Sequence, residues 1–220
     1  MNRIPEPELM NDPEQAAAYA GADFSDPHNL FIEKFGECFP DNGLMGHVLE
    51  LGCGPADITM RFARARTDVY IDAVDGSCAM LEHAKRTIAK AGLSSRINLI
   101  EGILPGIKPP EDTYETIISN SLLHHLHHPE ILWKTVKTFA QKGTIVFIMD
   151  LLRPLNEAAA ADLVRSYAGE EPKILQRDFY NSLCAAFSLD EVRMQLQDAD
   201  LEHFQLGQIS DRHMIIYGRI

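Results

Sequence analysis

VLELGCGPAD (residues 48–57) reads as an apolar strand that ends in a glycine-rich turn and runs into a helix. Gly52 and Gly54 let the backbone turn sharply and approach a ligand that any Cβ would block. The N–H groups at the start of the following helix then face that ligand. The stretch therefore predicts a turn that binds a nucleotide-like cofactor.

The charges around this turn indicate which cofactor it binds. A dinucleotide fingerprint has a third small residue where the helix start holds a pyrophosphate. Here that position is Asp57, whose charge would repel phosphate, and Glu50 places a second carboxylate before the glycines. Asp75 closes the apolar run 69–74, about 20 residues beyond the glycines, where an acid can bind ribose hydroxyls. A site for ribose and a cation, without phosphate, suits S-adenosylmethionine.

The motifs, taken in order, resemble the class I S-adenosylmethionine-dependent methyltransferases of the small-molecule type. Residues 50–54 and 75–77 are similar to the first two family motifs, and residues 114–120 and 143–148 to its fourth and fifth strands. The resemblance covers roughly residues 45–150. It implies an α/β, Rossmann-like fold with a seven-stranded, mostly parallel sheet and helices on both faces. It also implies methyl transfer to a small molecule, with S-adenosyl-L-methionine as cofactor and S-adenosyl-L-homocysteine as product.

Adenine recognition departs from the family pattern after the third strand. Where the family often has Gly-Asp-Ala, this chain has Gly102, Ile103 and Leu104. The acidic acceptor for the adenine amino group is missing, which leaves the N–H of Ile103 to serve an adenine nitrogen. We therefore expect the adenine to lie between the apolar side chains of Met80, Ile103 and Leu104.

The predicted cofactor site follows from the strand ends, because ligands of open α/β sheets bind at the carboxyl ends of strands. Glu50 is expected to stabilise the methionine end of the cofactor, and Asp75 to hold the ribose. The predicted cofactor-binding residues are Glu50, Gly52, Cys53, Gly54, Asp75, Gly76, Ser77, Met80, Gly102, Ile103, Leu104 and Asn120.

Four histidines, at positions 124, 125, 127 and 128, follow the predicted fourth strand. Imidazoles can bind metal or act as a base. No Asp, Glu or Cys lies close by in the sequence to complete a metal site, so no metal is predicted. His125 is the predicted catalytic base if the acceptor requires one, and His124 a substrate contact on the opposite side of a strand end. His128 is expected to cap the helix that begins at Pro129, and packing is the alternative role for the cluster.

Further substrate contacts are predicted outside the cofactor core. Arg153, just past the fifth strand, is the preferred cation on the substrate side, and Tyr19 belongs to the N-terminal cover. Arg177 and Tyr180 can hold an anionic or aromatic substrate, with a solvated helix face as the alternative. Residues 211–213 are read as a turn.

Strand-like runs alternate with helical patterns, which favours parallel strands joined by crossover helices in a single methyltransferase domain, residues 1–220. The predicted parts are an N-terminal helical cover (1–44) and a cofactor-binding core (45–150). A helical insertion after strand 5 (151–187) and a C-terminal helix with two closing strands (188–220) complete it.

The composition argues against several functional classes. A net charge of −12 disfavours nucleic acid, because affinity for the phosphate backbone comes from clustered Lys and Arg. No apolar run approaches the length of a membrane span, and the N-terminus lacks the apolar core of a signal peptide, so we expect a cytoplasmic protein. The four cysteines are scattered, which argues against a disulfide framework or zinc site. A homodimer is left open.

Other functions stay open at this stage. Another S-adenosylmethionine-using transferase, of the aminopropyl or carboxymethyl type, would share the fold and the cofactor site. A non-catalytic binding protein on the same fold would not need the acid missing at Ile103. A nicotinamide dehydrogenase is disfavoured by Asp57. The sequence does not determine the acceptor or whether O, N, S or C is methylated.

Overall fold

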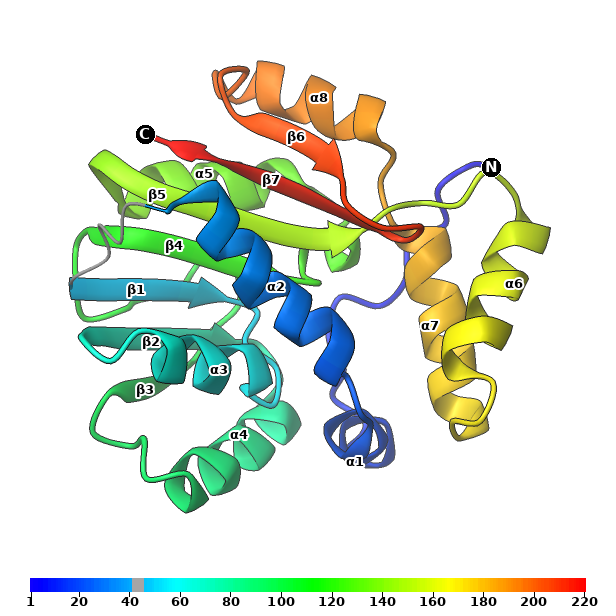
Figure 1. Ribbon diagram of the computed structural model, residues 1–220, viewed down its shortest axis with the longest axis horizontal. Coiled ribbons are helices and arrows are strands. Elements are labelled where there is room, and N and C mark those ends of the chain that lie inside the picture. The colour runs from blue at the N-terminus through cyan, green and yellow to red at the C-terminus, as the bar shows by residue number, and fades with distance from the viewer. Residues whose placement is uncertain (41–45) are drawn as a thin grey trace.

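A single seven-stranded sheet organises the chain (Figure 1), and the computed structural model describes residues 1–40 and 46–220. The strands are β1 Gly46–Leu51, β2 Val69–Asp75, β3 Ile97–Glu101, β4 Tyr114–Asn120, β5 Ala140–Leu151, β6 Gln205–Gln208 and β7 His213–Arg219. Their order is β3-β2-β1-β4-β5-β7-β6. Strands β1 to β5 pair in parallel, whereas β7 pairs antiparallel with β5 and with β6. The predicted α/β fold class is confirmed.

Helices cover both faces of this sheet and its carboxyl end (Figure 1). In the described ranges they are α1 Pro13–Gly21, α2 Ser25–Cys38, α3 Asp57–Ala65, α4 Cys78–Lys90, α5 Glu130–Phe139, α6 Glu157–Ala168, α7 Lys173–Ala185 and α8 Leu189–Asp198. A short 3₁₀ turn, η1 Leu123–His125, follows β4. None of the described helices is long and apolar enough to cross a membrane.

Alternating side chains of the strands build two cores, one on each face of the sheet. Val48 packs with α2, α3 and α4, whereas its neighbour Leu49 packs with α5 and α8, as expected from the two-residue period of a strand. The ring of Phe147 in β5 makes T-shaped, edge-to-face contacts with Phe31 and Phe35 of α2, with ring centroids 4.9 and 5.4 Å away. The strands are thus buried on both faces and form a rigid support for the loops at their ends.

The carboxyl end of the sheet is covered by segments that lie far apart in the sequence. Helices α6 and α7 contact each other. Helix α1 contacts both α4 and α7, so it lies between the helix that follows β2 and the helical insertion that follows β5 (Figure 1). Helices α6 and α7 are separated at Gly169–Pro172, as the sequence indicates. The predicted boundary between cover and core, at residues 44 and 45, lies outside the described residues.

The start of α5 corrects one expectation about the histidines. The helix begins at Glu130, with Pro129 at its N-cap and no side-chain hydrogen bond to the first turn. His128 therefore does not cap it. Its exposed ring instead lies 3.5 Å from a carboxylate oxygen of Glu130.

A buried carboxylate in the sheet gives a first test. Asp72 of β2 accepts hydrogen bonds from the Tyr114 hydroxyl and the Asn98 amide, each 2.7 Å long. Tyr114→Phe should lower the free energy of unfolding in urea by about 1.5–3 kcal/mol, because a bond to a charged, buried group is lost. Tyr70→Phe, at an exposed position of β2, is the matched control and should change the free energy of unfolding by less than about 0.5 kcal/mol. Equal losses in both variants would contradict the role given to Asp72.

Candidate active site

A cavity of ≈ 420 Å³ lies at the carboxyl ends of β1, β2 and β4. All twelve predicted cofactor-binding residues line it. This position follows from the sheet order, because the chain runs from β1 through β2 to β3 on one side and then returns to β4 on the other side of β1.

The glycine turn after β1 has the backbone conformation that its sequence predicts. Gly52 and Gly54 have φ values of 75° and 52°, which favour glycine. A Cβ at Gly52 would approach the Leu122 side chain to 3.0 Å. The N–H groups of Gly52 and Cys53 both donate to the Val74 carbonyl at 2.9 Å. The turn is therefore anchored to the end of β2.

Asp75 connects this turn to the next loop. One carboxylate oxygen accepts from the Gly54 N–H at 2.7 Å, and the other from the Ser77 N–H at 2.8 Å. Ser77 in turn caps α4 by accepting from the N–H of Met80. Burial raises the pKa of Asp75, and the backbone donors oppose that shift. The carboxylate is thus fixed at the cavity wall between two cofactor-binding loops.

Glu50 is a carboxyl group in an unfavourable environment. Its side chain is 1% exposed, and Oε2 has no hydrogen-bond partner among the described residues. Burial raises the pKa of Glu50 to about 8, and the nearby Asp75 and Asp57 carboxylates add to the shift. Such a group favours either a proton or a cationic ligand.

Asp57 is less repulsive towards anions than its sequence position suggests. Its carboxylate lies 2.5 Å from His28 Nδ1 and accepts from Arg61 Nε at 2.7 Å. Burial opposes its ionisation, but these two partners more than offset that cost and lower the pKa of Asp57 to about 2. The charge is therefore shared within a small network that also brings His28 of α2 to the cavity.

His124 and His125 both line the cavity, with ring centroids 4.3 Å apart. The expectation that they point in opposite directions is wrong, because they lie in the 3₁₀ turn η1 rather than on a strand. His124 Nδ1 lies 2.6 Å from Oδ1 of the fully buried Asp150, at the end of β5. Burial alone lowers the pKa of His124, but the Asp150 carboxylate raises it above the ordinary value. Burial and the neighbouring His124 lower the pKa of His125 to about 3. Of the two rings, only His124 thus has a buried carboxylate as its partner, and the catalytic role of His125 stays a prediction.

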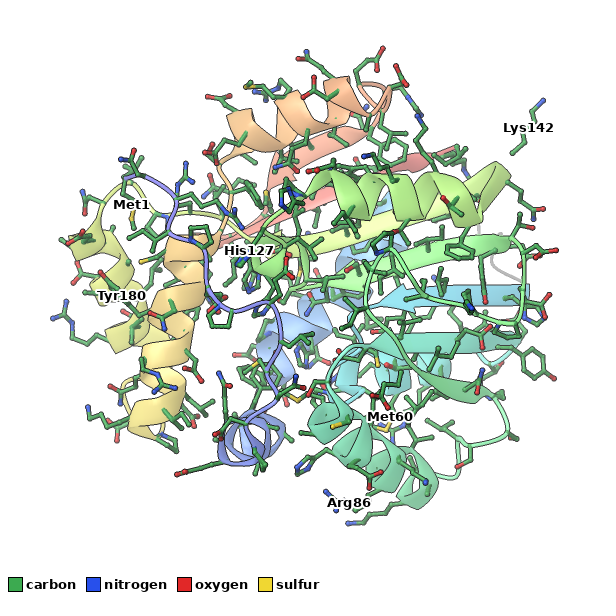
Figure 2. The ribbon with its side chains drawn as sticks, turned by 180° about the vertical axis from the view of Figure 1, so that it is seen from behind. Met1, Met60, Arg86, His127, Lys142 and Tyr180 are labelled. Carbon is green, nitrogen blue, oxygen red and sulfur yellow. The ribbon has the colours of Figure 1, made fainter. Side chains whose placement is uncertain are left out.

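The N-terminal segment, residues 3–10, passes beside His127 of the same histidine run (Figure 2). Arg3 donates to the carbonyls of His124, Leu126 and Ala185 at 2.6–2.9 Å. The His127 N–H donates to Glu8 at 2.9 Å, and Ser77 Oγ donates to the Met10 carbonyl at 2.8 Å. The segment is thus tied to α7, η1 and α4, and it forms part of the cavity wall.

Three of the predicted substrate contacts are not in the cavity wall. Arg153 donates to Glu191 at 2.8 Å and has a side chain that is 10% exposed, so it is held against α8. Arg177 pairs with Asp178 and is 63% exposed. Tyr180 packs beside the small core between α6 and α7. By contrast, Tyr19 and His124 line the cavity as predicted.

Several cavity residues were missed by the sequence analysis. Arg212 and His213 line the cavity, although residues 211–213 were read as a turn. Because β7 is antiparallel, its first residue, His213, pairs with Leu151 at the carboxyl end of β5. An antiparallel last strand begins at the carboxyl end of its parallel neighbours, and this direction could have indicated that Arg212 and His213 lie at the cavity. Glu6 and Asp150 are not in the cavity lining but contact His124, and the sequence could not show these contacts because each joins residues far apart in the chain.

Residues 48–143 match a family model described as a methyltransferase domain. The matched segment is thus similar to a methyltransferase domain, and it spans the strands from β1 to the start of β5. A curated relative of the domain, (S)-coclaurine N-methyltransferase of Thalictrum flavum subsp. glaucum, is 30% identical over 104 residues, which is 47% of this chain and 28% of that protein. The chain spans well under half the length of the curated relatives it matches.

Solved structures of methyltransferases share the fold over nearly the whole chain. A SAM-dependent methyltransferase from Aquifex aeolicus superposes with a TM-score of 0.65 at 18% identity and covers 94% of this chain and 97% of that chain. The plantazolicin methyltransferase BpumL, in complex with a pentazolic desmethylPZN analog and SAH, gives a TM-score of 0.70 at 13% identity, with coverages of 94% and 90%. The methyltransferase fold therefore includes the helical segments on both sides of the matched domain.

The pH dependence of stability tests the environment of Glu50. Burial raises the pKa of Glu50 from its ordinary value of 4.5 to about 8, so between these values the folded state binds more protons than the unfolded state. Stability should therefore fall as the pH rises through this window. Glu50→Gln removes this titration. The melting temperature of the variant minus that of the parent should therefore be larger at about pH 8.5 than at about pH 5.

The control for this experiment is Glu101→Gln, at an exposed glutamate at the end of β3. Its melting temperature relative to the parent should be the same at both pH values. A difference for Glu50→Gln that does not change with pH would contradict a protonated Glu50.

Proposed function

We propose that this chain transfers a methyl group from S-adenosylmethionine to a small-molecule acceptor and releases S-adenosylhomocysteine. The observation that carries the proposal is a pair of buried acceptors at the glycine turn. Glu50 Oε2 and Asn120 Oδ1 have no hydrogen-bond partner within residues 1–40 and 46–220, and both residues line the cavity. Buried acceptors are costly unless they are paired. The α-ammonium of the cofactor supplies the donors and the positive charge that such a site lacks.

The other residues of the cavity fit the rest of the cofactor. Asp75 would hold the ribose hydroxyls, and the turn at Gly52 and Gly54 would admit the methionine end. Ile103 is 56% exposed, so its apolar surface is available to an adenine ring beside Met80 and Leu104. The missing acid after β3 would then be replaced by apolar contact and by the N–H of Ile103.

The remaining residues of the site would align the acceptor. S-adenosylmethionine, when bound, supplies a methyl group that its sulfonium already activates, so alignment and water exclusion are the main tasks of the protein. Residues 3–10 would limit access of water from one side. The contact with Asp150 leaves a lone pair on His124 Nε2, which can take a proton from an acceptor that has one to lose. His125, with its low pKa, would contribute shape rather than proton transfer.

The volume of the cavity and the charge of the chain support a small-molecule acceptor. A cavity of ≈ 420 Å³ falls in the range of small-molecule sites. The net charge of −12 and the carboxylates around the cavity favour a neutral or cationic acceptor over nucleic acid. The small-molecule substrate in the name of the coclaurine N-methyltransferase supports the same class. A cytoplasmic location and a homodimer stay predictions.

Calorimetry tests the cofactor assignment directly. The chain should bind S-adenosylhomocysteine, and Asp75→Ala should weaken this binding by about 1.5–3 kcal/mol because hydrogen bonds to a charged group are lost. Asp68→Ala, at an exposed position just before β2, should bind like the parent. If neither S-adenosylmethionine nor S-adenosylhomocysteine binds at millimolar concentration, a non-catalytic role on the same fold is the better explanation.

A further inference from the structure

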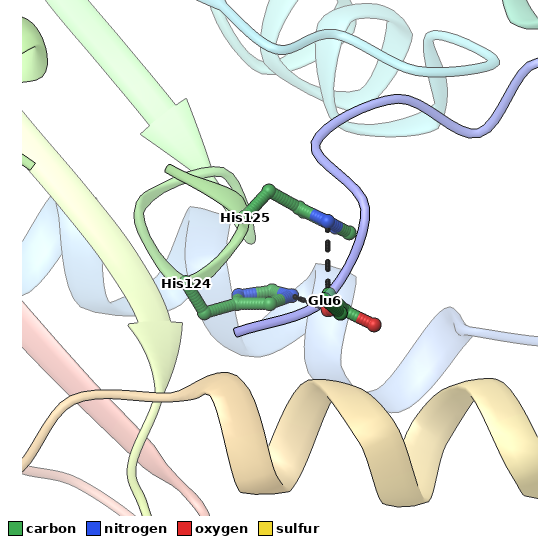
Figure 3. A group of neighbouring side chains, drawn as sticks. All are labelled: Glu6, His124 and His125. Carbon is green, nitrogen blue, oxygen red and sulfur yellow. Dashed lines mark ion pairs between the residues drawn. The ribbon is translucent and has the colours of Figure 1, made fainter. Parts of the chain in front are cut away.

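Three metal-ligating side chains converge under the N-terminal segment (Figure 3). Glu6, His124 and His125 each offer one ligand atom, and these atoms all lie within 4.8 Å of one another. Glu6 Oε1 lies 3.6 Å from His124 Nε2 and 3.4 Å from His125 Nδ1. Ligands at about 2.0–2.1 Å from a tetrahedral zinc ion are about 3.3 Å apart. The observed spacing is therefore close to that of ligands around one ion.

Glu6 has an oxygen that needs a partner. Its side chain is 10% exposed, and Oε1 makes no hydrogen bond to any residue that the structure describes. An unpaired, buried carboxylate oxygen aimed at two imidazoles is costly without a cation between them.

The two histidines present suitable lone pairs. The contact between His124 Nδ1 and Asp150 places the proton on that nitrogen and leaves Nε2 free, which is the carboxylate–histidine arrangement behind many metal ligands. His125 Nδ1 faces the same Glu6 oxygen as His124 Nε2 does, so both imidazoles present a ring nitrogen to one point. The 3.4 Å contact of His125 with the Pro7 carbonyl is at the outer limit of a hydrogen bond and holds Nδ1 only weakly.

We propose that Glu6, His124 and His125 form a binding site for a zinc-type divalent ion at the edge of the cavity. Two histidines and one glutamate are a ligand set of catalytic zinc sites, which keep a fourth position open. The sequence predicts no metal because no acid lies near the histidines along the chain. Folding supplies Glu6 from the N-terminal segment, more than a hundred residues away.

The site also indicates an acceptor class, and this step rests on the proposed methyl transfer. A thiol or hydroxyl of the acceptor would take the open position and lose its proton to solvent. The electron pair of that oxygen or sulfur then forms the bond to the methyl carbon. The electron pair of the broken carbon–sulfur bond stays on the cofactor sulfur. In this arrangement His124 acts as a ligand and not as the base.

Cobalt substitution tests the metal site without an activity assay. The chelator-treated protein should take up one Co²⁺ per chain, with visible absorption bands of a four- or five-coordinate ion, and Zn²⁺ should displace it. Glu6→Gln, His124→Gln and His125→Gln should each abolish these bands. Asp150→Asn should weaken Co²⁺ binding by about 10–100-fold, as expected for a residue that orients a ligand.

Matched controls separate this result from adventitious binding. His128→Ala, in the same histidine run but 73% exposed, and Cys78→Ser, at an exposed thiol, should keep both stoichiometry and spectrum. Circular dichroism and binding of S-adenosylhomocysteine verify that the ligand variants fold. Uptake below one equivalent, or bands that survive in all three ligand variants, would overturn the metal site. Loss of cofactor binding in the parent would overturn the proposed function and leave the cobalt result standing.

Discussion

The buried carboxylate of Asp150 holds the η1 turn in place, and the wall of the cavity beside this turn depends on its hydrogen bonds. Oδ2 accepts from the Leu123 N–H at 2.7 Å, and Oδ1 contacts His124 Nδ1 at 2.6 Å, so one side chain at the end of β5 fixes the turn after β4. That turn presents the carbonyls and rings to which the N-terminal segment attaches. Because Asp150 is fully buried, its charge is protected from water and these bonds are correspondingly strong.

An excess of carboxylates gives the cavity its chemical character. Glu50, Asp57 and Asp75 surround the glycine turn, and of these only Asp57 is seen to pair with a cationic side chain in the described part of the chain. Asp75 accepts from two backbone N–H groups, whereas Glu50 is buried with an Oε2 that has no partner among the described residues, so the region around both acids attracts positive charge. The same acidity weakens any preference for phosphate-bearing ligands, although the network of His28 and Arg61 reduces the contribution of Asp57.

The sequence alone predicts the elements whose determinants are local. The glycine turn, the place of Asp75 and the alternation of strands with helices follow from short motifs, and the predicted cofactor-binding residues line one cavity. Arg153 could not be placed, because its partner Glu191 lies 38 residues further on and also completes the capping box with Ser188. His124 and His125 could not be oriented, since a 3₁₀ turn brings together rings that a strand would separate. Asp150, Glu6 and Arg212 reach the site only through tertiary contacts.

The N-terminal segment has a consequence for how the site forms during folding. Its contacts with η1 join residues more than a hundred positions apart, for example Arg3 and the His124 carbonyl, 121 residues on. Closing so long a loop carries an entropic cost that is recovered only once the sheet and η1 are in place. The site is therefore complete only in the folded chain. A ligand that binds the folded chain alone stabilises the entire sheet against unfolding, and this stabilisation grows with the logarithm of the ligand concentration once that exceeds Kd.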